Sequence, residues 1–135
     1  MEKDRIIVKA CLDDELLDVA ELVLYDGNVQ EDLTRYKSSQ AWVKANNDNY
    51  SQFFAAYQND KIVGYGLLKR DPQKFDEYQE HNFHVINNNK NCLHIIKEKA
   101  RIYFQNRGFV YNPIISKEIV GTTRKDETPK VLPAA

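Results

Sequence analysis

Residues 53–70 read FFAAYQNDKIVGYGLLKR, two apolar runs joined by the polar turn QNDK. Residues that favour β-structure on both sides of a short Asn/Asp turn are typical of a β-hairpin. We expect a first strand near residues 53–57 and a second near residues 62–69. Gly64 and Gly66 fall in the second strand, which indicates either a bulge or a place where another backbone or a ligand comes close.

A strand and two helices are expected before the hairpin. Residues 5–10 (RIIVKA) favour β-structure, and apolar residues then recur at helical spacing from Leu12 to Leu24. The acidic triplet DDE after Leu12 suits a helix N-terminus, where negative charge is favourable. A shorter helix over residues 38–45 carries the single tryptophan, Trp42, which we expect to lie in the core.

After the hairpin, the polar residues 73–80 predict a partly helical connector. Residues 81–86 (HNFHVI) alternate like a further strand, with Phe83 and Val85 on one face. The longest helical pattern covers residues 92–106.

Residues 109–115 predict the last strand. The chain therefore predicts an α/β (α+β) fold with a mixed, mostly antiparallel central sheet flanked by helices. We expect residues 1–127 to form one domain and residues 128–135, with Pro129 and Pro133, to form a flexible tail.

Composition narrows the class of protein. The 135 residues contain no apolar run long enough to cross a bilayer and no secretory leader, and two widely spaced cysteines predict free thiols, so we expect a soluble, cytoplasmic protein. Residues 1–60 carry a net charge of −6 and residues 61–135 one of +5. This asymmetry favours either an anionic ligand on the basic half or attraction between the halves. The basic residues form no block with interleaved aromatics, so we expect no nucleic-acid partner.

Three segments resemble the GNAT superfamily of acetyl-CoA-dependent N-acetyltransferases: RIIVKACLDDELLDVAELV, the hairpin FFAAYQNDKIVGYGLL, and ARIYFQNRGF. The resemblance covers about half of the chain and implies a GNAT-like fold, acetyl-CoA as co-substrate, and an amine of a small molecule or a protein as acceptor. Members of the family have an Arg/Gln-x-x-Gly-x-Gly/Ala loop after the fourth strand, and its amides bind the coenzyme A pyrophosphate at a helix N-terminus.

This chain has NNNKNC at residues 87–92, without glycine. Lys90 takes the place of the basic residue of the signature, and Asn91 is expected to adopt a positive backbone angle. The resemblance thus assigns coenzyme contacts to the strand end and this loop: Val85, Asn87, Asn89, Lys90, Asn91 and Cys92. The segment ARIYFQNRGF also resembles a later part of the family, and that register would delete most of the coenzyme-binding strand and helix.

The resemblance also implies catalytic groups. A general base of the family is often a carboxylate or a histidine near the fourth strand, which indicates Glu80, His81 or His84. The family tyrosine that protonates the departing thiolate falls at Phe104, one position from the hydroxyl of Tyr103. We take Glu80, His84 and Tyr103 as the candidates.

A metal site and a non-catalytic function are two further interpretations of this sequence. The histidines at 81, 84 and 94 with Cys92 lack the spacing of a metal site, so we expect no metal. A fold can also persist after its active site is lost. The alternative function is a non-catalytic GNAT-like protein that binds a protein partner or forms a homo-oligomer, for example an accessory, virion or host-interaction protein of a phage.

Overall fold

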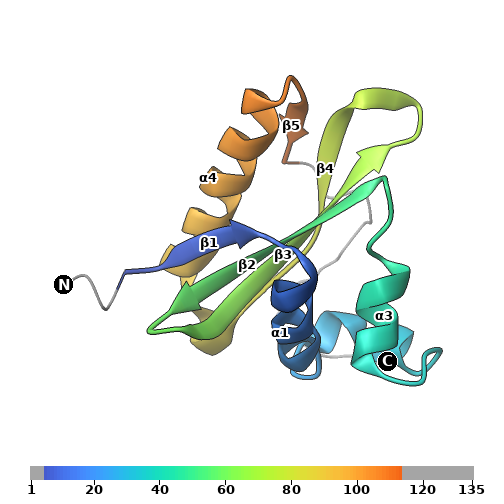
Figure 1. The fold of residues 1–135 in the computed structure, drawn as a ribbon, viewed down its shortest axis with the longest axis vertical. Helices are drawn as coiled ribbons and strands as arrows, with labels where there is room; N and C mark the ends of the chain where they lie inside the picture. Colours follow the sequence, from blue (N-terminus) through green and yellow to red (C-terminus); the bar gives the residue numbers. More distant parts are fainter. Residues whose placement is uncertain (1–4, 114–135) are drawn as a thin grey trace.

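The computed structural model describes residues 5–113. Figure 1 shows a curved sheet with helices on both faces, as the sequence predicts. The elements follow in the order β1 (Ile7–Ala10), α1 (Asp13–Val23), the 3-10 turn η2 (Gly27–Val29), α2 (Gln30–Leu33), α3 (Ser39–Ala45), β2 (Ser51–Gln58), β3 (Lys61–Asp71), β4 (Lys74–Val85), the 3-10 turn η3 (Ile86–Asn88), α4 (Lys90–Asn106) and β5 (Val110–Asn112).

The strands lie in the order β1-β2-β3-β4-β5. The first four pair antiparallel, and β5 pairs parallel to β4. The expected hairpin is confirmed as β2 and β3. Asn59 and Asp60 form its turn with φ values of 54° and 66°, the left-handed pair that matches the twist of a tight hairpin.

The connector expected over residues 73–80 is wrong, because β4 begins at Lys74 and continues to Val85. Only Pro72 and Gln73 separate it from β3. In this segment the buried Tyr78 and Glu80 alternate with more exposed residues. Pairing with β3 satisfies the backbone of this polar stretch, which its composition alone does not predict.

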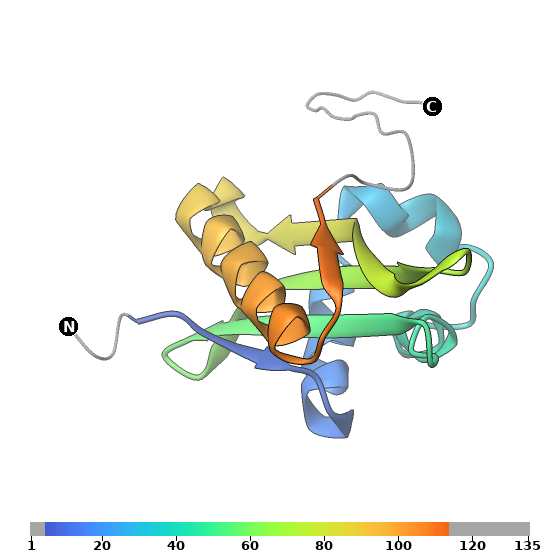
Figure 2. The same cartoon turned by 90° about the horizontal axis from the view of Figure 1, so that it is seen from above.

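Two cores fill the two faces of the sheet. The helices α1 and α3 cover one face, and α4 crosses the other (Figure 2). Trp42 is 3% exposed in the first core, as expected. The first core comprises Val19, Ala20, Leu22, Val23, Val29, Trp42, Val43, Phe53, Ala55, Tyr65 and Leu67. The second comprises Phe54, Ala56, Val63, Leu68, Tyr78, Cys92, Ile96, Ala100 and Phe104.

The two glycines of β3 are places of close approach. A Cβ atom on Gly66 would lie 2.5 Å from Cε2 of Phe83, and one on Gly64 would lie 2.9 Å from Cγ1 of Val85. Phe83 and Val85 share the face that α4 covers, as expected. The register of β2 and β3 also shifts beside Gly64. Both interpretations of the glycines are therefore correct. A bulge lies beside Gly64, and close neighbours lie against both Gly64 and Gly66.

A second register shift lies in β4. Leu67 pairs with Asn82 and Leu68 with Glu80, so His81 is the extra residue of a β-bulge. Before the bulge, Glu80 faces α4. After the bulge, the even-numbered residues of β4, Asn82 among them, face α1 instead.

The remaining predictions concern the ends of elements. Ser38 caps α3 as expected, its hydroxyl accepting a hydrogen bond from the amide of Ala41. The long helix begins at Lys90, two residues earlier than predicted. The last strand is described only as Val110–Asn112, and the tail at 128–135 lies outside the described residues.

Within residues 5–113, none of the helices has the length and apolarity to span a bilayer.

Candidate functional site

The described parallel pairing of β4 and β5 covers three residue pairs. Their partners are Glu77 with Val110, Tyr78 with Tyr111 and Gln79 with Asn112. Beyond Gln79, the edge of β4 that faces β5 has no strand partner among the residues that the structure describes. The helix α4 starts a few residues after the end of β4, so the end of β4 and the helix N-terminus adjoin.

Glu80 directly follows Gln79, the last residue of β4 that pairs with β5. Its carboxylate is 3.3 Å from Nζ of Lys97 on α4 and accepts a hydrogen bond from the hydroxyl of Tyr111 on β5. Burial first, and the hydrogen bond to Glu80 second, raise the pKa of Tyr111. Glu80 therefore joins β4, β5 and α4 on the face that α4 covers.

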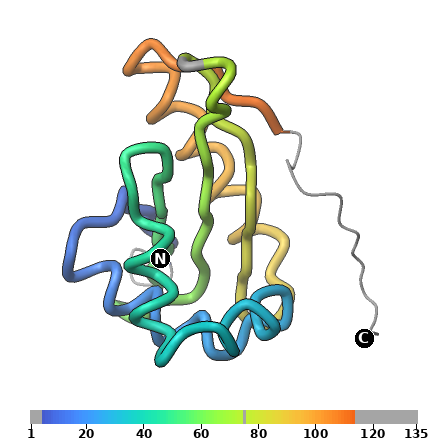
Figure 3. Tube along the Cα trace, turned by 90° about the vertical axis from the view of Figure 1, so that its right-hand side faces the viewer, coloured from blue at the N-terminus to red at the C-terminus, as the bar shows by residue number. Residues whose placement is uncertain are grey.

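His84 lies on the other face, four residues after Glu80. Its Nδ1 is 3.8 Å from Oδ1 of Asp26, the range of an ion pair rather than of a hydrogen bond. Figure 3 shows the cyan segment after α1 crossing beside the end of β4. In a regular strand all even-numbered residues would share one face. The bulge at His81 breaks this alternation, so Glu80 and His84 lie on opposite faces of the sheet.

Asp26 belongs to a buried polar cluster, which we call the Asp26 cluster: Asp26, Tyr65, Asn82 and His84. The residue is 1% exposed. Its Oδ2 accepts hydrogen bonds from the Tyr65 hydroxyl at 2.5 Å and from Nδ2 of Asn82 at 2.9 Å. Burial and the neighbouring carboxylate raise the pKa of Tyr65 well above its usual value. No local sequence signal indicates that Asp26, Tyr65 and Asn82 come together, because their contacts join distant parts of the chain.

The loop between β4 and α4 replaces glycine with asparagine. Asn87 and Asn88 have φ values of 53° and 54°, the left-handed conformation that asparagine tolerates. Asn91, which was expected to adopt such an angle, instead lies within α4, so that expectation is wrong. The side chain of Asn89 caps the helix and accepts the amide of Cys92 at 3.0 Å.

The N-terminus of α4 retains donors for an anion. The amides of Lys90 and Asn91, in the first turn, have no intrahelical acceptor. Lys90 is exposed, and Cys92 is buried with its thiol pKa raised by burial. The amides and the lysine fit a phosphate group, although the asparagine side chains leave less room than glycine would.

Tyr103 lies elsewhere on α4. Its ring packs edge-on against Phe54 of β2, with 5.2 Å between centroids, and the guanidinium of Arg107 lies 3.6 Å from the ring centre. Glu80, His84 and Tyr103 thus each have partners on different elements, and the structure does not bring the three together.

The 3-10 turn η3 joins β4 to α4, and α4 leads to β5, which runs parallel to β4. No group of three or more His, Cys, Asp or Glu side chains within residues 5–113 is arranged to hold a metal ion.

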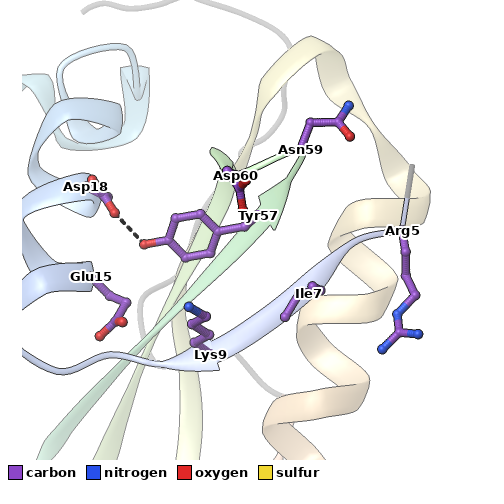
Figure 4. Close-up of a pocket in the computed structure, with 8 residues that line it drawn as sticks. All are labelled: Arg5, Ile7, Lys9, Glu15, Asp18, Tyr57, Asn59 and Asp60. Atoms are coloured by element: carbon purple, nitrogen blue, oxygen red, sulfur yellow. Dashed lines mark hydrogen bonds between the residues drawn. The ribbon is translucent and has the colours of Figure 1, made fainter. Parts of the chain in front are cut away.

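A hollow of about 380 Å³ lies between β1, α1 and the β2–β3 turn (Figure 4). Three of the charged groups that line it already have partners. Asp18 accepts the Tyr57 hydroxyl at 2.6 Å, Lys9 lies over the Tyr57 ring, and Glu15 accepts the amide of Leu12. We assign no ligand to this hollow.

Solved structures of acetyltransferases share the fold. A ribosomal-protein-alanine N-acetyltransferase from Brucella melitensis matches with a TM-score of 0.64 and 9% identity, over 91% of this chain and 83% of its own. A protein named as an acetyltransferase of the GNAT family, from Desulfovibrio desulfuricans, matches with a TM-score of 0.59 and 14% identity, over 78% and 69%. The PaiA N-acetyltransferase of Thermoplasma acidophilum, solved with coenzyme A, gives 0.54 and 13%, over 78% and 75%.

No family model matches the chain, and no curated protein matches it by sequence. At these low identities the matches concern the fold alone. The expected GNAT-like fold is confirmed.

Proposed function

We propose, from the fold that the chain shares with GNAT acetyltransferases, that it transfers an acetyl group from acetyl-CoA to an amine of a small molecule or a protein. The observation that carries this proposal is the N-terminus of α4, which follows the end of β4 and has first-turn amides without intrahelical acceptors. Main-chain groups at the end of a strand and at a helix N-terminus offer donors to an acyl group and to a phosphate.

The reaction needs three things from the protein. The acceptor nitrogen must lose a proton as it attacks the thioester carbon, the carbonyl oxygen must be stabilised, and the C–S bond must break to release a thiolate that takes up a proton. We assign the carbonyl contact to the main chain of β4 near Val85. The products are an N-acetyl amide and coenzyme A.

We assign the phosphate contacts to the loop and first turn of α4. The amides of Lys90 and Asn91 supply donors, and the Lys90 ammonium supplies charge. Asn87 and Asn89 set the path of the loop, and Cys92 closes the first turn through its bond to Asn89.

Calorimetric titration of the full chain with acetyl-CoA tests the proposal. We expect saturable binding, and Lys90→Ala should weaken it about fivefold, the loss of roughly 1 kcal/mol for an exposed charge contact. Lys99→Ala is the matched control, because Lys99 is an exposed lysine further along the same helix and should leave the affinity unchanged. Absence of binding at millimolar acetyl-CoA would contradict the proposal.

A non-catalytic, protein-binding function is the second candidate. One observation favours it: the loop before α4 lacks glycine, and Asn89 itself occupies the amide of Cys92. On this alternative, the same titration gives no heat of binding, and light scattering detects an oligomer or a complex with a stable partner.

A further inference from the structure

The outer side of α1 presents apolar side chains to solvent. The helix buries one side against the sheet, and Leu17 and Leu24 on the opposite side are 54% and 55% exposed. Glu21 lies between them and is exposed as well, because residues three and four apart are neighbours on a helix surface. We call these three residues the α1 stripe. A single exposed leucine is ordinary, but two leucines one heptad apart are typical of a helix that pairs with another helix.

The outer side of α4 repeats this spacing with the opposite charge. Ile102 is 43% exposed, Ile95 is partly buried, and the exposed Lys99 lies between them; we call these three residues the α4 stripe. Each stripe has apolar residues at positions i and i+7 and a charged residue at i+4. Neither Glu21 nor Lys99 has an ion-pair partner within residues 5–113.

The two helices also differ in total charge. The helix α1 has five acidic and no basic side chains, whereas α4 has four basic and one acidic. They pack on opposite faces of the sheet, so the two sets of charges do not meet within one chain (Figure 2). The charge asymmetry of the sequence therefore favours a contact between two copies.

We propose that the α1 stripe of one copy of this chain binds the α4 stripe of a second copy. The apolar residues of the two stripes pack against each other, and Glu21 pairs with Lys99 at the centre. Apolar burial supplies the affinity, and the charges select the partner. An antiparallel crossing puts the acidic start of α1 toward Arg107, just after α4, and leaves the start of α4 free. The contact is therefore separate from the proposed acetyl-CoA site.

This contact is heterologous, because it joins two different surfaces. A copy that is bound through its α1 stripe still has its α4 stripe open, since the stripes lie on opposite faces of the sheet. Contacts of this kind add copies head to tail instead of closing a two-fold dimer. Two crossing helices bury little area, so we expect weak association, at chain concentrations of roughly 100 μM and above.

Sedimentation equilibrium of the full chain provides the first test. We expect the weight-average mass to rise with concentration beyond that of a dimer. Raising the salt from about 50 mM to about 500 mM should weaken the association severalfold, because salt screens charges at an exposed contact. A chain that stays monomeric up to about 1 mM overturns the proposal, and a mass that levels off at a dimer overturns the head-to-tail arrangement.

Charge exchange provides the second test. Glu21→Lys and Lys99→Glu should each weaken association about tenfold or more, and the variant with both substitutions should regain it. An equimolar mixture of the two single variants should also associate, because each offers the other an opposite charge at both contacts. Glu31→Lys and Lys37→Glu are the matched controls. They make the same charge changes at exposed residues outside both stripes and should leave association unchanged.

The outcomes are distinct from those of the acetyl-CoA titration. If the double variant and the mixture stay monomeric while circular dichroism shows them folded, the pairing of Glu21 with Lys99 is wrong. Association of Glu21→Lys alone at the wild-type strength would also contradict it. Lys90→Ala should associate like the wild type, and Glu21→Lys should bind acetyl-CoA like the wild type. Failure of the wild type to bind acetyl-CoA therefore bears on the proposed function and leaves this contact to be decided by the mass.

Discussion

Gly66 is a residue at which β3, β4 and α4 pack closely together. A Cβ atom there would lie 2.5 Å and 2.7 Å from two ring atoms of Phe83 and 3.2 Å from Cγ2 of Ile96. Non-bonded carbon atoms do not approach to such distances without displacement. The residue is therefore needed for the contact between the helix and the strand that carries His84.

We predict that Gly66→Ala lowers the free energy of unfolding by about 1–3 kcal/mol, the usual cost of overpacking a core. Gly27→Ala is the control, because nothing lies within 4 Å of a Cβ at Gly27, and its effect should stay within about 0.5 kcal/mol. Urea unfolding measures both variants. Equal midpoints for the two would show that the β3–β4–α4 contact has room to relax.

The element that decides the site is β4. Its bulge at His81 sends Glu80 toward α4 and His84 toward Asp26, so one strand supplies ionisable groups to both faces of the sheet. Side chains as well as backbone hold the short strand β5 to β4. The Tyr111 hydroxyl donates a hydrogen bond to Glu80, and the Asn112 amide donates one to Glu77.

We predict that Tyr111→Phe destabilises the protein by about 1–3 kcal/mol, because a hydrogen bond to a buried carboxylate is lost. Tyr36→Phe is the control, since the Tyr36 side chain is exposed. Urea unfolding gives the stability, and hydrogen exchange of the β5 amides should be faster in Tyr111→Phe. Unchanged exchange in β5 would mean that its backbone pairing is sufficient.

At the scale of the whole molecule, burial raises the pKa of both thiols and of four tyrosines. The thiols are those of Cys11 and Cys92, and burial is the first cause for each. The tyrosines are Tyr57, Tyr65, Tyr78 and Tyr111, again with burial as the first cause. The folded state therefore keeps protons that the unfolded chain releases from about pH 9, because the ordinary pKa is 9.0 for Cys and 10.0 for Tyr.

We predict that the free energy of unfolding falls as the pH rises above about 9. The stabilising contribution is fully present below the unfolded values and is lost as the pH rises toward the folded ones, because the unfolded state then binds fewer protons. Urea midpoints at pH 7, 9 and 10.5 measure the effect. Tyr65→Phe should flatten the dependence, and a midpoint that rises with pH would refute the assignment.

The sequence by itself determined the local structure of this protein. Asn59 and Asp60 specified the hairpin turn, the apolar spacing of α1 and α4 specified helices with one buried face, and Ser38 specified a cap. Each of these signals depends on residues close together in the chain. The GNAT-like fold was predicted from the resemblance of three segments to that superfamily, and solved structures that share the fold confirm the prediction.

Only the tertiary structure decided the site. The polar start of β4 becomes a strand because β3 lies beside it, and the bulge at His81 reverses the faces that strand parity predicts. Asp26 meets Tyr65, Asn82 and His84 through contacts that span 39 to 58 residues of chain. A local pattern carries no information on which distant donor will enclose a carboxylate. His84 was a candidate through the family resemblance, while its neighbours Asp26, Tyr65 and Asn82 depended on the folding of the sheet.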